Sequence, residues 1–548
     1  MTDLTAIIKG YNKAKASKDG LTSTWRDIAC YTRPFRQDIG TDTGGDTPGN
    51  KGLIDIFDTT AVDAARTYAA GCMSWMTPSE SHWAAYDAPE ELSEDDAVKS
   101  WYSKCTDIAR EVLAASNFYS QIHECYNDDG TFGTSGMLIE EDNKGGLRFE
   151  ALVIGKYAIL ENSRKEVDTV FIEKVLTLRQ AEQEFGRENL HIDHRELLED
   201  NQQDCEKTHT FIHCVMPRAD ADRQLGKLDS SNMPWASITF DLKNKKIVRE
   251  SGSWEMSVAV HRHAADPDSP WGYSPAMQAM TDIRQLNHMQ SYLDTLVEKQ
   301  VTPPVLLPSG FKGEVDLRAG GYTYFKNKEE MPTHWPNPGN YMIGEDRTVF
   351  RATQINRAFH VELFQALSAV PLGKEMTAAE VHMRQRDRLT LFSPTFARKN
   401  TELNTPIMRR VFALLLRNGA FPPPPPNLIT ETPEGLPYMP DPKITYTSRL
   451  ALQMKAIENE AFGRSFAETS PFFELAPETL DNYDSDAIAR AIYRNNGAPE
   501  EGLRPERERD LMRQERAEAQ QQAEQEMAEL EEADAVSKLA SSGAIAAA

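Results

Sequence analysis

Apolar residues recur at helical spacing near the start of the chain, give way to β-type runs, and return to helical spacing afterwards. The N-terminal helical runs stop at prolines or at a loop rich in Gly, Thr and Asp. Asp58 and Ser93-Glu94-Asp95-Asp96 are placed as helix N-caps, and the second run resembles a capping box. The predicted N-terminal helices cover residues 3–33, 58–76, 93–115 and 118–127.

The pattern changes at about Gly136. Short runs rich in β-branched and aromatic residues, separated by turn residues, are typical of strands. The sequence therefore predicts an α+β unit whose second half is β-rich. The predicted strands cover residues 137–140, 147–154, 169–178, 208–216, 237–242 and 257–263.

Two further helices are predicted on either side of a segment rich in Pro and Gly. An apolar stripe at helical spacing predicts the first at residues 277–299, before a Pro-Pro pair. Residues 301–348 are expected to form loops with short strands. Apolar residues four positions apart predict the second helix at 351–369, before Pro371 and Gly373 interrupt the pattern.

A full capping box, Thr377-Ala378-Ala379-Glu380, predicts the start of a long helix. The apolar face of this helix continues to about residue 418, and Gly419 ends it. Pro394 and Pro406 are expected to kink or break it, because each proline removes a backbone hydrogen-bond donor.

The C-terminal part begins with a polyproline run at 422–426, which predicts a stiff spacer. Helices are predicted at 449–467 and 486–494. From residue 506 the chain is rich in Glu, Gln, Arg and Ala with few apolar anchors, and its end is expected to be disordered.

The length of 548 residues suggests three or four domains, and an apolar content of 40% is enough for real cores. The six cysteines form no Cys-x-x-Cys pair, which indicates reduced thiols. No apolar stretch is long enough to span a bilayer, and the first ten residues lack the pattern of a secretory signal. We therefore expect synthesis in the cytosol and no membrane partner.

The net charge of −24, from 60 Lys+Arg and 84 Asp+Glu, is unusual for a protein that grips nucleic acid. The charge is segregated along the chain. Residues 351–418 contain 11 Lys+Arg and 5 Asp+Glu, whereas residues 500–534 contain 5 Arg and 13 Asp+Glu. Either DNA is not a partner, or the protein handles DNA without holding it tightly.

Motifs for common enzymes are absent from the sequence. Gly44 to Gly52 is the nearest approach to a phosphate-binding loop, but it lacks the Gly-Lys-Ser/Thr ending. Neither a nucleophile elbow nor His-Glu-x-x-His occurs. Cys205, His209 and His213 have helical spacing, yet they fall in a predicted strand and a fourth zinc ligand is not evident. We therefore favour a structural role for them over a metal site.

Three other polar groups have simpler interpretations than catalysis. His261 and His263 alternate along a strand and are interpreted as exposed histidines. Asp128-Asp129, followed by Gly130, is interpreted as a turn in preference to a two-metal site. Arg384 and Arg388 share one face of the predicted long helix, which is either a solvated face or a stripe facing DNA.

Four groups of residues, taken in order, resemble the portal, or head-to-tail connector, proteins of short-tailed bacteriophages. Together they span about 58–420, and the region after residue 426 matches only loosely. The groups are Asp58-Thr59-Thr60 with Ala69-Ala70-Gly71, Met76-Thr77-Pro78 and Trp83; Ser116-Asn117-Phe118-Tyr119 with Phe132-Gly133-Thr134; Trp271-Gly272-Tyr273-Ser274-Pro275-Ala276 with Asp282-Ile283 and Leu286-Asn287; and Met376-Thr377-Ala378-Ala379-Glu380-Val381 with Glu402-Leu403 and Pro406.

The resemblance implies an α+β, mostly helical subunit of a portal-type ring of twelve copies, with wing, stem, clip and crown. It implies no enzyme activity, cofactor or metal. The expected parts are an N-terminal wing at 1–276, stem helices at 277–299 and 351–369, a clip at 301–348, a channel loop at 370–376, a long kinked wing helix at 377–420, a crown at 421–500 and an acidic tail at 501–548.

The same resemblance implies a channel for double-stranded DNA at one capsid vertex of the virion. The expected partners are other copies of the chain, DNA, terminase, tail adaptor proteins, and the major capsid and scaffolding proteins. Arg384 and Arg388 are candidate basic residues facing the channel. The expected channel loop consists of Val370, Pro371, Leu372, Gly373, Lys374, Glu375 and Met376.

Two alternatives remain open at this point. One is a different ring-shaped head-completion adaptor, for which the chain is longer than expected. The other is an enzyme of the packaging motor, for which a phosphate-binding loop is missing.

Overall fold

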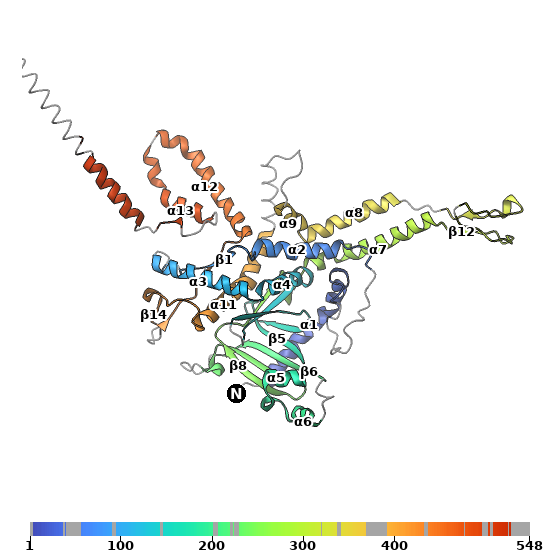
Figure 1. Ribbon diagram of the computed structural model, residues 1–548, viewed down its shortest axis with the longest axis horizontal. Coiled ribbons are helices and arrows are strands. Elements are labelled where there is room, and N and C mark those ends of the chain that lie inside the picture. Colours follow the sequence, from blue (N-terminus) through green and yellow to red (C-terminus); the bar gives the residue numbers. More distant parts are fainter. Residues whose placement is uncertain are drawn as a thin grey trace, which may run out of the picture.

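The structure is a computed structural model in which helices and sheets are combined. A central body carries a long helical hairpin on one side and C-terminal helices on another (Figure 1). The described residues are 4–36, 39, 56–89, 92, 95–142, 146–200, 207–219, 223, 229–318, 320–336, 341–368, 392–431, 437–475, 477–495, 502–504, 508–523, 525 and 527.

Four helices come first. The apolar face of the first helix packs on a sheet through Ile7, Tyr11 and Ala14, which share a buried cluster with Phe171 and Ile212. The helices are α1 (Leu4–Thr32), α2 (Thr60–Met76), α3 (Asp96–Ala115) and α4 (Phe118–Phe132).

Two antiparallel sheets make up the β-rich part. The smaller has the strand order β3-β2-β9, and the larger has the order β4-β5-β6-β7-β8, in which each strand pairs with the next along the chain. The smaller contains β2 (Thr134–Glu141), β3 (Leu147–Leu152) and β9 (Val258–Arg262). The larger contains β4 (Tyr157–Glu161), β5 (Val167–Thr177), β6 (Thr208–Pro217), β7 (Trp235–Asp241) and β8 (Lys246–Ser253), with α5 (Leu178–Phe185) and α6 (Ile192–Asp200) between β5 and β6.

A short strand pair, β10 (Ala264–Asp266) and β11 (Ser269–Tyr273), leads into the projecting hairpin of α7 (Pro275–Val301) and α8 (Tyr341–Ala358). The two helices lie side by side, because a side chain on Gly344 would place its Cβ only 2.4 Å from Leu293 Cδ2. Arg351 of α8 also forms an ion pair with Asp282 of α7.

The chain then returns to the body through α9 (Val361–Ser368). A helix at 392–399 continues into a π-turn (Asn400–Asn404) and then into α11 (Thr405–Arg417). The remaining elements are a strand pair of β1 (Ala84–Asp87) with β16 (Lys443–Tyr446), a strand pair of β14 (Thr430–Glu431) with β15 (Pro437–Tyr438), and the helices α12 (Arg449–Leu475) and α13 (Ser485–Asn495). Among the described residues no helix is long and apolar enough to cross a membrane.

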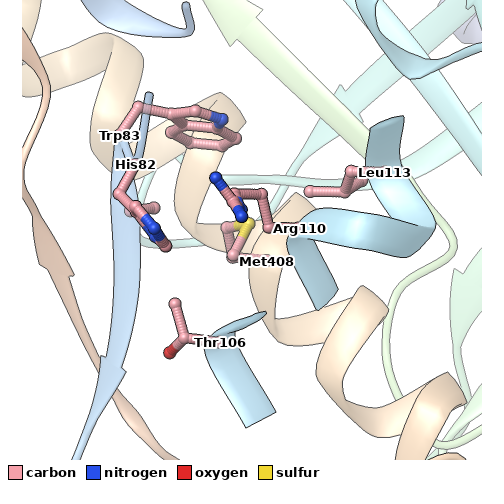
Figure 2. Close-up of a pocket in the computed structure, with 7 residues that line it drawn as sticks. His82, Trp83, Thr106, Arg110, Leu113 and Met408 are labelled. Carbon is pink, nitrogen blue, oxygen red and sulfur yellow. The ribbon is translucent and has the colours of Figure 1, made fainter. Parts of the chain in front are cut away.

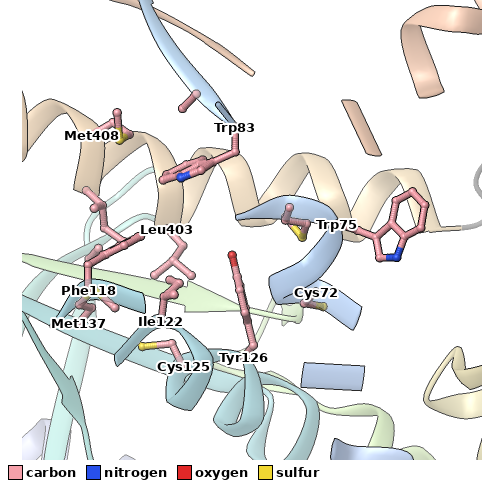
Figure 3. Close-up of a cluster of buried hydrophobic side chains, with 14 of the residues drawn as sticks. Cys72, Trp75, Trp83, Phe118, Ile122, Cys125, Tyr126, Met137, Leu403 and Met408 are labelled. Carbon is pink, nitrogen blue, oxygen red and sulfur yellow. The ribbon is translucent and has the colours of Figure 1, made fainter. Parts of the chain in front are cut away.

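The largest core cluster joins α2, α3 and α4 to α11 and to the base of the hairpin. We call the helix that runs from residue 392 through the π-turn to Arg417 the late helix. Figure 3 shows the centre of the cluster, where side chains of α2 and α4 meet Leu403 and Met408 from the late helix. The ring of Trp83 stacks on that of Phe118 with an interplanar angle of 8°. This packing fixes the late helix against the N-terminal helices, although the two are distant in sequence.

Most elements predicted from apolar spacing are confirmed, with shifted ends. The predicted strands correspond to β2, β3, β5, β6, β7 and β9, while β4 and β8 were not predicted. Asp95 is the N-cap of α3, and its side chain accepts a hydrogen bond from the Ala97 amide. Asp58 accepts a hydrogen bond from the Thr60 amide, but the N-cap position of α2 is Thr59.

The single helix predicted at 351–369 is wrong in its bounds. Helix α8 begins at Tyr341 and ends at Ala358, and His360 with a positive φ of 53° separates it from α9. A non-glycine residue in this conformation breaks the helical hydrogen-bond ladder. The apolar spacing of four persists across the break, so periodicity alone could not reveal it.

Candidate assembly surface and hairpin base

The hairpin and its tip carry an unusual concentration of exposed apolar side chains. Among the described residues, sixteen of the twenty-eight exposed large hydrophobic side chains lie between Tyr292 and Phe350. So many exposed apolar side chains on one projection are typical of an interaction site in a folded protein. The sixteen are Tyr292, Val297, Val301, Leu306, Leu307, Leu317, Tyr322, Tyr324, Phe325, Met331, Trp335, Tyr341, Met342, Ile343, Val349 and Phe350.

The tip of the hairpin is weakly held by its own chain. Strands β12 (Val305–Leu306) and β13 (Thr333–His334) pair over only two residues each. One further backbone bond joins the Trp335 amide to the Pro304 carbonyl at 2.8 Å. Within the same tip segment, Tyr324 is 84% exposed and Trp335 is 57% exposed. An isolated two-stranded ribbon is marginal in water, so this tip lacks a covering partner within the described chain.

The base of the hairpin is formed where two of the sequence motifs that resemble the connector family meet. Gly133 ends α4 in a left-handed conformation with φ of 78°. A Cβ there would lie 2.5 Å from the Tyr273 carbonyl carbon and 2.6 Å from the Gly272 oxygen. The two backbones therefore touch, and only glycine fits at Gly133.

Polar contacts fix the first turn of α7 at the same place. Ser274 is the N-cap of α7 and accepts a hydrogen bond from the Met277 amide at 2.9 Å. Its hydroxyl donates to the Thr131 carbonyl at 2.8 Å, and the Gly272 amide donates to the Thr134 hydroxyl at 2.9 Å. The direction in which the hairpin leaves the body is therefore set by the last turn of α4.

A buried group of charges lies close to this base. Lys399 Nζ is 2.7 Å from Asp129 Oδ2, and both side chains are fully buried. The Tyr68 hydroxyl accepts a hydrogen bond from Lys399 Nζ and donates one to Asp129 Oδ2, each at 2.6 Å. His261 Nε2 lies 3.0 Å from Asp129 Oδ1, and His263 Nδ1 lies 3.4 Å from Asp129 Oδ2.

Two interpretations of the sequence are corrected by this group. Asp128, Asp129 and Gly130 do not form a turn, because they lie inside α4 and are buried. His261 and His263 are not exposed: β9, which contains His261, is buried on both faces, and His263, directly after the strand, is buried as well. Asp-Gly sequences favour turns locally, but here Lys399 compensates the buried carboxylate.

Burial is the largest single effect on Asp129 and would raise its pKa, but Lys399, His261 and His263 together outweigh burial and hold that pKa well below its usual range. Burial is likewise the largest single effect on Lys399 and would lower its pKa, but Asp129 and Cys72 together outweigh burial and raise that pKa. Burial lowers the pKa of His261, against the opposing effect of Asp129. The pair therefore stays charged at neutral pH inside an apolar core.

The other candidate metal ligands do not form a site in the described residues. His209 and His213 lie on β6, as the predicted strand requires, and Cys205 is outside the described residues. His213 Nε2 is 2.9 Å from the Ser237 hydroxyl. In the described part of the chain, no group of three or more His, Cys, Asp or Glu side chains is placed to hold a metal ion.

A small cavity lies between β1, α3 and α11. His82, Trp83, Thr106, Arg110 and Met408 are among its lining residues (Figure 2). Its volume of about 10 Å³ is roughly that of one water molecule. The cavity is therefore a packing defect and not a substrate site.

The predicted channel residues cannot be placed. Val370 to Met376, Thr377, Arg384 and Arg388 lie outside the described residues. Their two neighbouring described segments, α9 and the helix at 392–399, pack together through Phe364 and Phe392, whose ring centroids are 5.7 Å apart.

Comparison with known proteins shows which family the chain belongs to. The sequence profile of the bacteriophage head to tail connecting protein family matches residues 4–503. A probable portal protein of Bordetella phage BPP-1 is 28% identical over 558 residues, covering 98% of this chain and 96% of that protein. The portal protein of Salmonella phage epsilon15 is 27% identical over 544 residues, covering 96% and 93%.

Among solved structures, similarity extends to chains of gene transfer agent (GTA) particles. A chain from the virion of a native particle matches with a TM-score of 0.36 and 10% identity over 75% of this chain and 86% of that chain. A chain from the neck of an empty particle matches with a TM-score of 0.33 and 11% identity over 63% and 76%. Since the family profile covers residues 4–503, the chain belongs to the bacteriophage head-to-tail connecting protein family.

Proposed function

We propose that this chain is a portal protein. It forms a ring of twelve copies at one vertex of a phage capsid, conducts double-stranded DNA during packaging and ejection, and provides the attachment site for the packaging motor and the tail. The observation that carries the proposal is the projecting hairpin with its exposed apolar side chains, in a chain of the connector family. A closed ring of identical subunits covers such surfaces through heterologous contacts.

The proposed parts of the subunit follow from this arrangement. Helices α7 and α8 are the stem, and the segment that joins them, within residues 301–348, is the clip. The body of helices and sheets is the wing, together with the long helix within 377–420. Residues 421–500, which include α12 and α13, are the crown. The projection of α7 and α8 from the body supports the stem assignment (Figure 1).

The acidic composition fits a channel that DNA must pass through. Each phosphate that a protein neutralises adds salt-dependent affinity, which would slow sliding. A net charge of −24, with a local basic surplus at 351–418, keeps such contacts few. The proposed partners, besides DNA and other copies, are terminase, tail adaptor proteins, and the major capsid and scaffolding proteins.

Ring formation is the first test. Purified protein is expected to form closed rings in native mass spectrometry and in averaged electron micrographs. Tyr324→Ser with Trp335→Ser is expected to weaken assembly by about tenfold or more, because aromatic residues dominate interface energies. Ile192→Ser, which changes a 60% exposed residue of α6, is the matched control and should assemble normally.

The outcome also separates the alternatives. A monomer at micromolar concentration with no rings on grids contradicts the proposal. A ring of much lower subunit number, or one that binds only to preformed portals, would favour a head-completion adaptor. Steady ATP hydrolysis by the purified ring would favour a packaging-motor enzyme.

The proposed channel loop, Val370 to Met376, gives a second test. Lys374 is its one cation, and twelve copies would place a ring of point charges against the DNA backbone without sequence preference. Lys374→Glu is expected to leave rings intact while DNA packaging or retention falls. A variant that packages and retains DNA like the parent would remove this loop from the channel.

A further inference from the structure

Strand β3 forms one edge of the smaller sheet. In the described part of the chain it pairs on one side with β2, while the amides of Phe149 and Ala151 point away from β2. An edge strand with free backbone groups is a template on which a strand of another chain can add. In a protein that assembles from identical copies, an open edge would offer every copy a wrong partner.

Two side chains of α4 occupy the hydrogen-bonding positions that a neighbouring strand would fill. Asn117 Nδ2 donates to the Phe149 carbonyl at 2.7 Å, and Asn117 Oδ1 accepts from the Phe149 amide at 3.0 Å. Gln121, one helical turn later, accepts from the Ala151 amide through Oε1 at 2.9 Å. Both backbone groups of Phe149 are therefore paired, as they would be opposite another strand.

The spacing along the helix matches the spacing along the strand. Four residues of an α-helix advance about 6 Å along its axis. Two residues of a strand, which is the step between backbone groups that point to the same edge, advance about 6.7 Å. Asn117 and Gln121 are four residues apart in α4, and their partners are two residues apart in β3. The start of α4 can therefore run along the edge and pair with it at both positions.

The side chain of Asn117 does not act as a helix cap. Asn117 occupies the N-cap position of α4, where an asparagine usually accepts a hydrogen bond from the first turn of its own helix. Here its side chain makes no such bond. The Ser116 hydroxyl accepts from the Phe118 amide instead, at 3.2 Å. The asparagine therefore serves the strand edge and not the end of the helix.

Hydrogen-bond satisfaction alone does not explain this arrangement. Asn117 is exposed, Gln121 is half-buried, and the side chains of Arg148 and Glu150 on β3 are exposed, so the edge lies at the surface. Water can pair with exposed backbone groups nearly as well as a side-chain amide does. Water cannot exclude another strand, however, whereas a fixed side chain can. Charged side chains on an edge strand, here Arg148 and Glu150, also oppose strand addition.

Helix side chains meet the outer amides of two further edge strands. The Arg262 amide of β9, at the other edge of the same sheet, donates to Glu402 Oε2 of the late helix at 2.9 Å. The Tyr86 amide of β1 donates to the Thr106 hydroxyl of α3 at 2.9 Å. Arg262, Tyr86 and Thr106 are buried. Of these three contacts, the one at β3 is therefore the one that another copy can approach.

We propose that Asn117 and Gln121 form a side-chain strand that closes the β3 edge against strand addition by a second copy of this chain. Assembly is thereby directed to other surfaces, among them the exposed hairpin. The inference goes beyond the proposed portal function and stands on the geometry of the single chain, so it does not depend on the number of copies in the ring.

The first test removes the side-chain strand with Asn117→Ala and Gln121→Ala. In dilute solution, hydrogen exchange at the Phe149 and Ala151 amides is expected to be about tenfold faster or more, because both lose their partners. Mass spectrometry with electron-transfer fragmentation reads these amides one by one. The Glu150 amide points to β2 and should keep the parental rate. Unchanged exchange at Phe149 and Ala151, or equal acceleration at all three amides, would overturn the proposal.

A single substitution covers the case in which this double variant does not fold. Gln121→Ala frees the Ala151 amide and leaves both hydrogen bonds between Asn117 and Phe149 in place. Exchange is therefore expected to rise about tenfold at Ala151 and to stay at the parental rate at Phe149. Parental exchange at Ala151 in the folded single variant would show that Gln121 does not hold the edge, and the proposal would fail.

At higher concentration the double variant is expected to associate beyond the parental assembly. Light scattering should show species of at least about twice the parental mass, and infrared spectra should gain an intermolecular β-sheet band, because two free edges can pair. His123→Ala with Asn127→Ala is the matched control, since these two side chains of α4 lie 3.2 Å apart and bond to each other. The control should keep the parental size. A double variant of parental mass at every concentration contradicts the proposal.

A third substitution separates edge pairing from a general loss of stability. Ala151→Pro, added to the double variant, removes the outward amide that an incoming strand needs. Proline is tolerated on an edge strand where its nitrogen faces away from the sheet. Association is therefore expected to return to the parental level although Asn117 and Gln121 are still replaced. If the triple variant associates as strongly as the double variant, association does not proceed through the β3 edge and the proposal is wrong.

Discussion

Gly133→Ala is expected to lower the free energy of unfolding by about 2–5 kcal/mol. The left-handed conformation costs alanine about 1–2 kcal/mol. The new Cβ would also lie 2.5–2.6 Å from backbone atoms of Gly272, Tyr273 and Ser274, which must move to make room. Overpacking of this kind typically costs about 1–3 kcal/mol.

The displaced atoms belong to the end of β11 and to the N-cap of α7, so the damage should reach the hairpin. Urea unfolding followed by circular dichroism would measure the loss of stability, and hydrogen exchange at the start of α7 would locate it. Gly419→Ala is the matched control, because Gly419 has a similar φ of 66° but no atom within 4 Å of the added Cβ. Equal losses from the two substitutions would show that the close approach at Gly133 is not costly.

Acidification from pH 7.5 to 4.5 is expected to destabilise the fold by several kcal/mol, mainly through buried neutral histidines. Burial lowers the pKa of His213 to about 3, and Lys174 and Arg249 add to the effect. Burial also lowers the pKa of His360 to about 4, assisted by His263 and Lys399. The unfolded chain binds these protons below about pH 6.5, whereas the folded chain binds them only near pH 3–4.

The direction of the pH effect on stability follows from this difference in pKa between the folded and unfolded chain. A histidine whose folded pKa is depressed loses its stabilising contribution as the pH falls below about 6.5, so His213 alone accounts for about 3 kcal/mol at pH 4.5. Asp129 behaves differently, because its depressed pKa keeps its contribution in place until the pH falls below about 3.8. Carboxylate titration at this site is therefore not the cause of a loss between pH 6.5 and 4.5.

The measurement compares unfolding at the two pH values in the parent and in His213→Gln. The glutamine does not titrate and can still hydrogen-bond to Ser237, so its pH dependence should be smaller by about 3 kcal/mol at pH 4.5. His288→Gln, on the exposed face of α7, should keep the parental dependence. If His213→Gln loses as much stability as the parent, the buried imidazole is not the titrating group.

Local sequence patterns were sufficient to predict most of the helices and strands. Helical spacing of apolar residues placed α1 and α7, and short runs rich in β-branched and aromatic residues placed most strands, because these apolar residues are buried by the fold. The region around residue 360 shows the limit of such signals. The spacing of four continues through it, but a left-handed residue at His360 divides the predicted helix into α8 and α9.

The buried charged group around Asp129 and Lys399 was not predictable from local sequence pattern. Asp128, Asp129 and Gly130 have the composition of a turn, and nothing near them in the sequence supplies a compensating charge. The compensation for Asp129 comes from Lys399, which the packing of the late helix brings against α4. The sequence shows only that the apolar positions before residue 400 and those after it are offset from each other by one residue along the helix.

By itself, the sequence determined the mixed α+β composition, the order of the main helices and strands, and the motifs that resemble the connector family. These depend on residues within a few turns of one another. Tertiary structure alone decided that Gly133 must touch Gly272, that a π-turn precedes Pro406, and that Asp129 of α4 is buried beside Lys399. Such features arise because a buried charge or a close backbone approach depends on what the distant chain places opposite it, and local propensity carries no information about that partner.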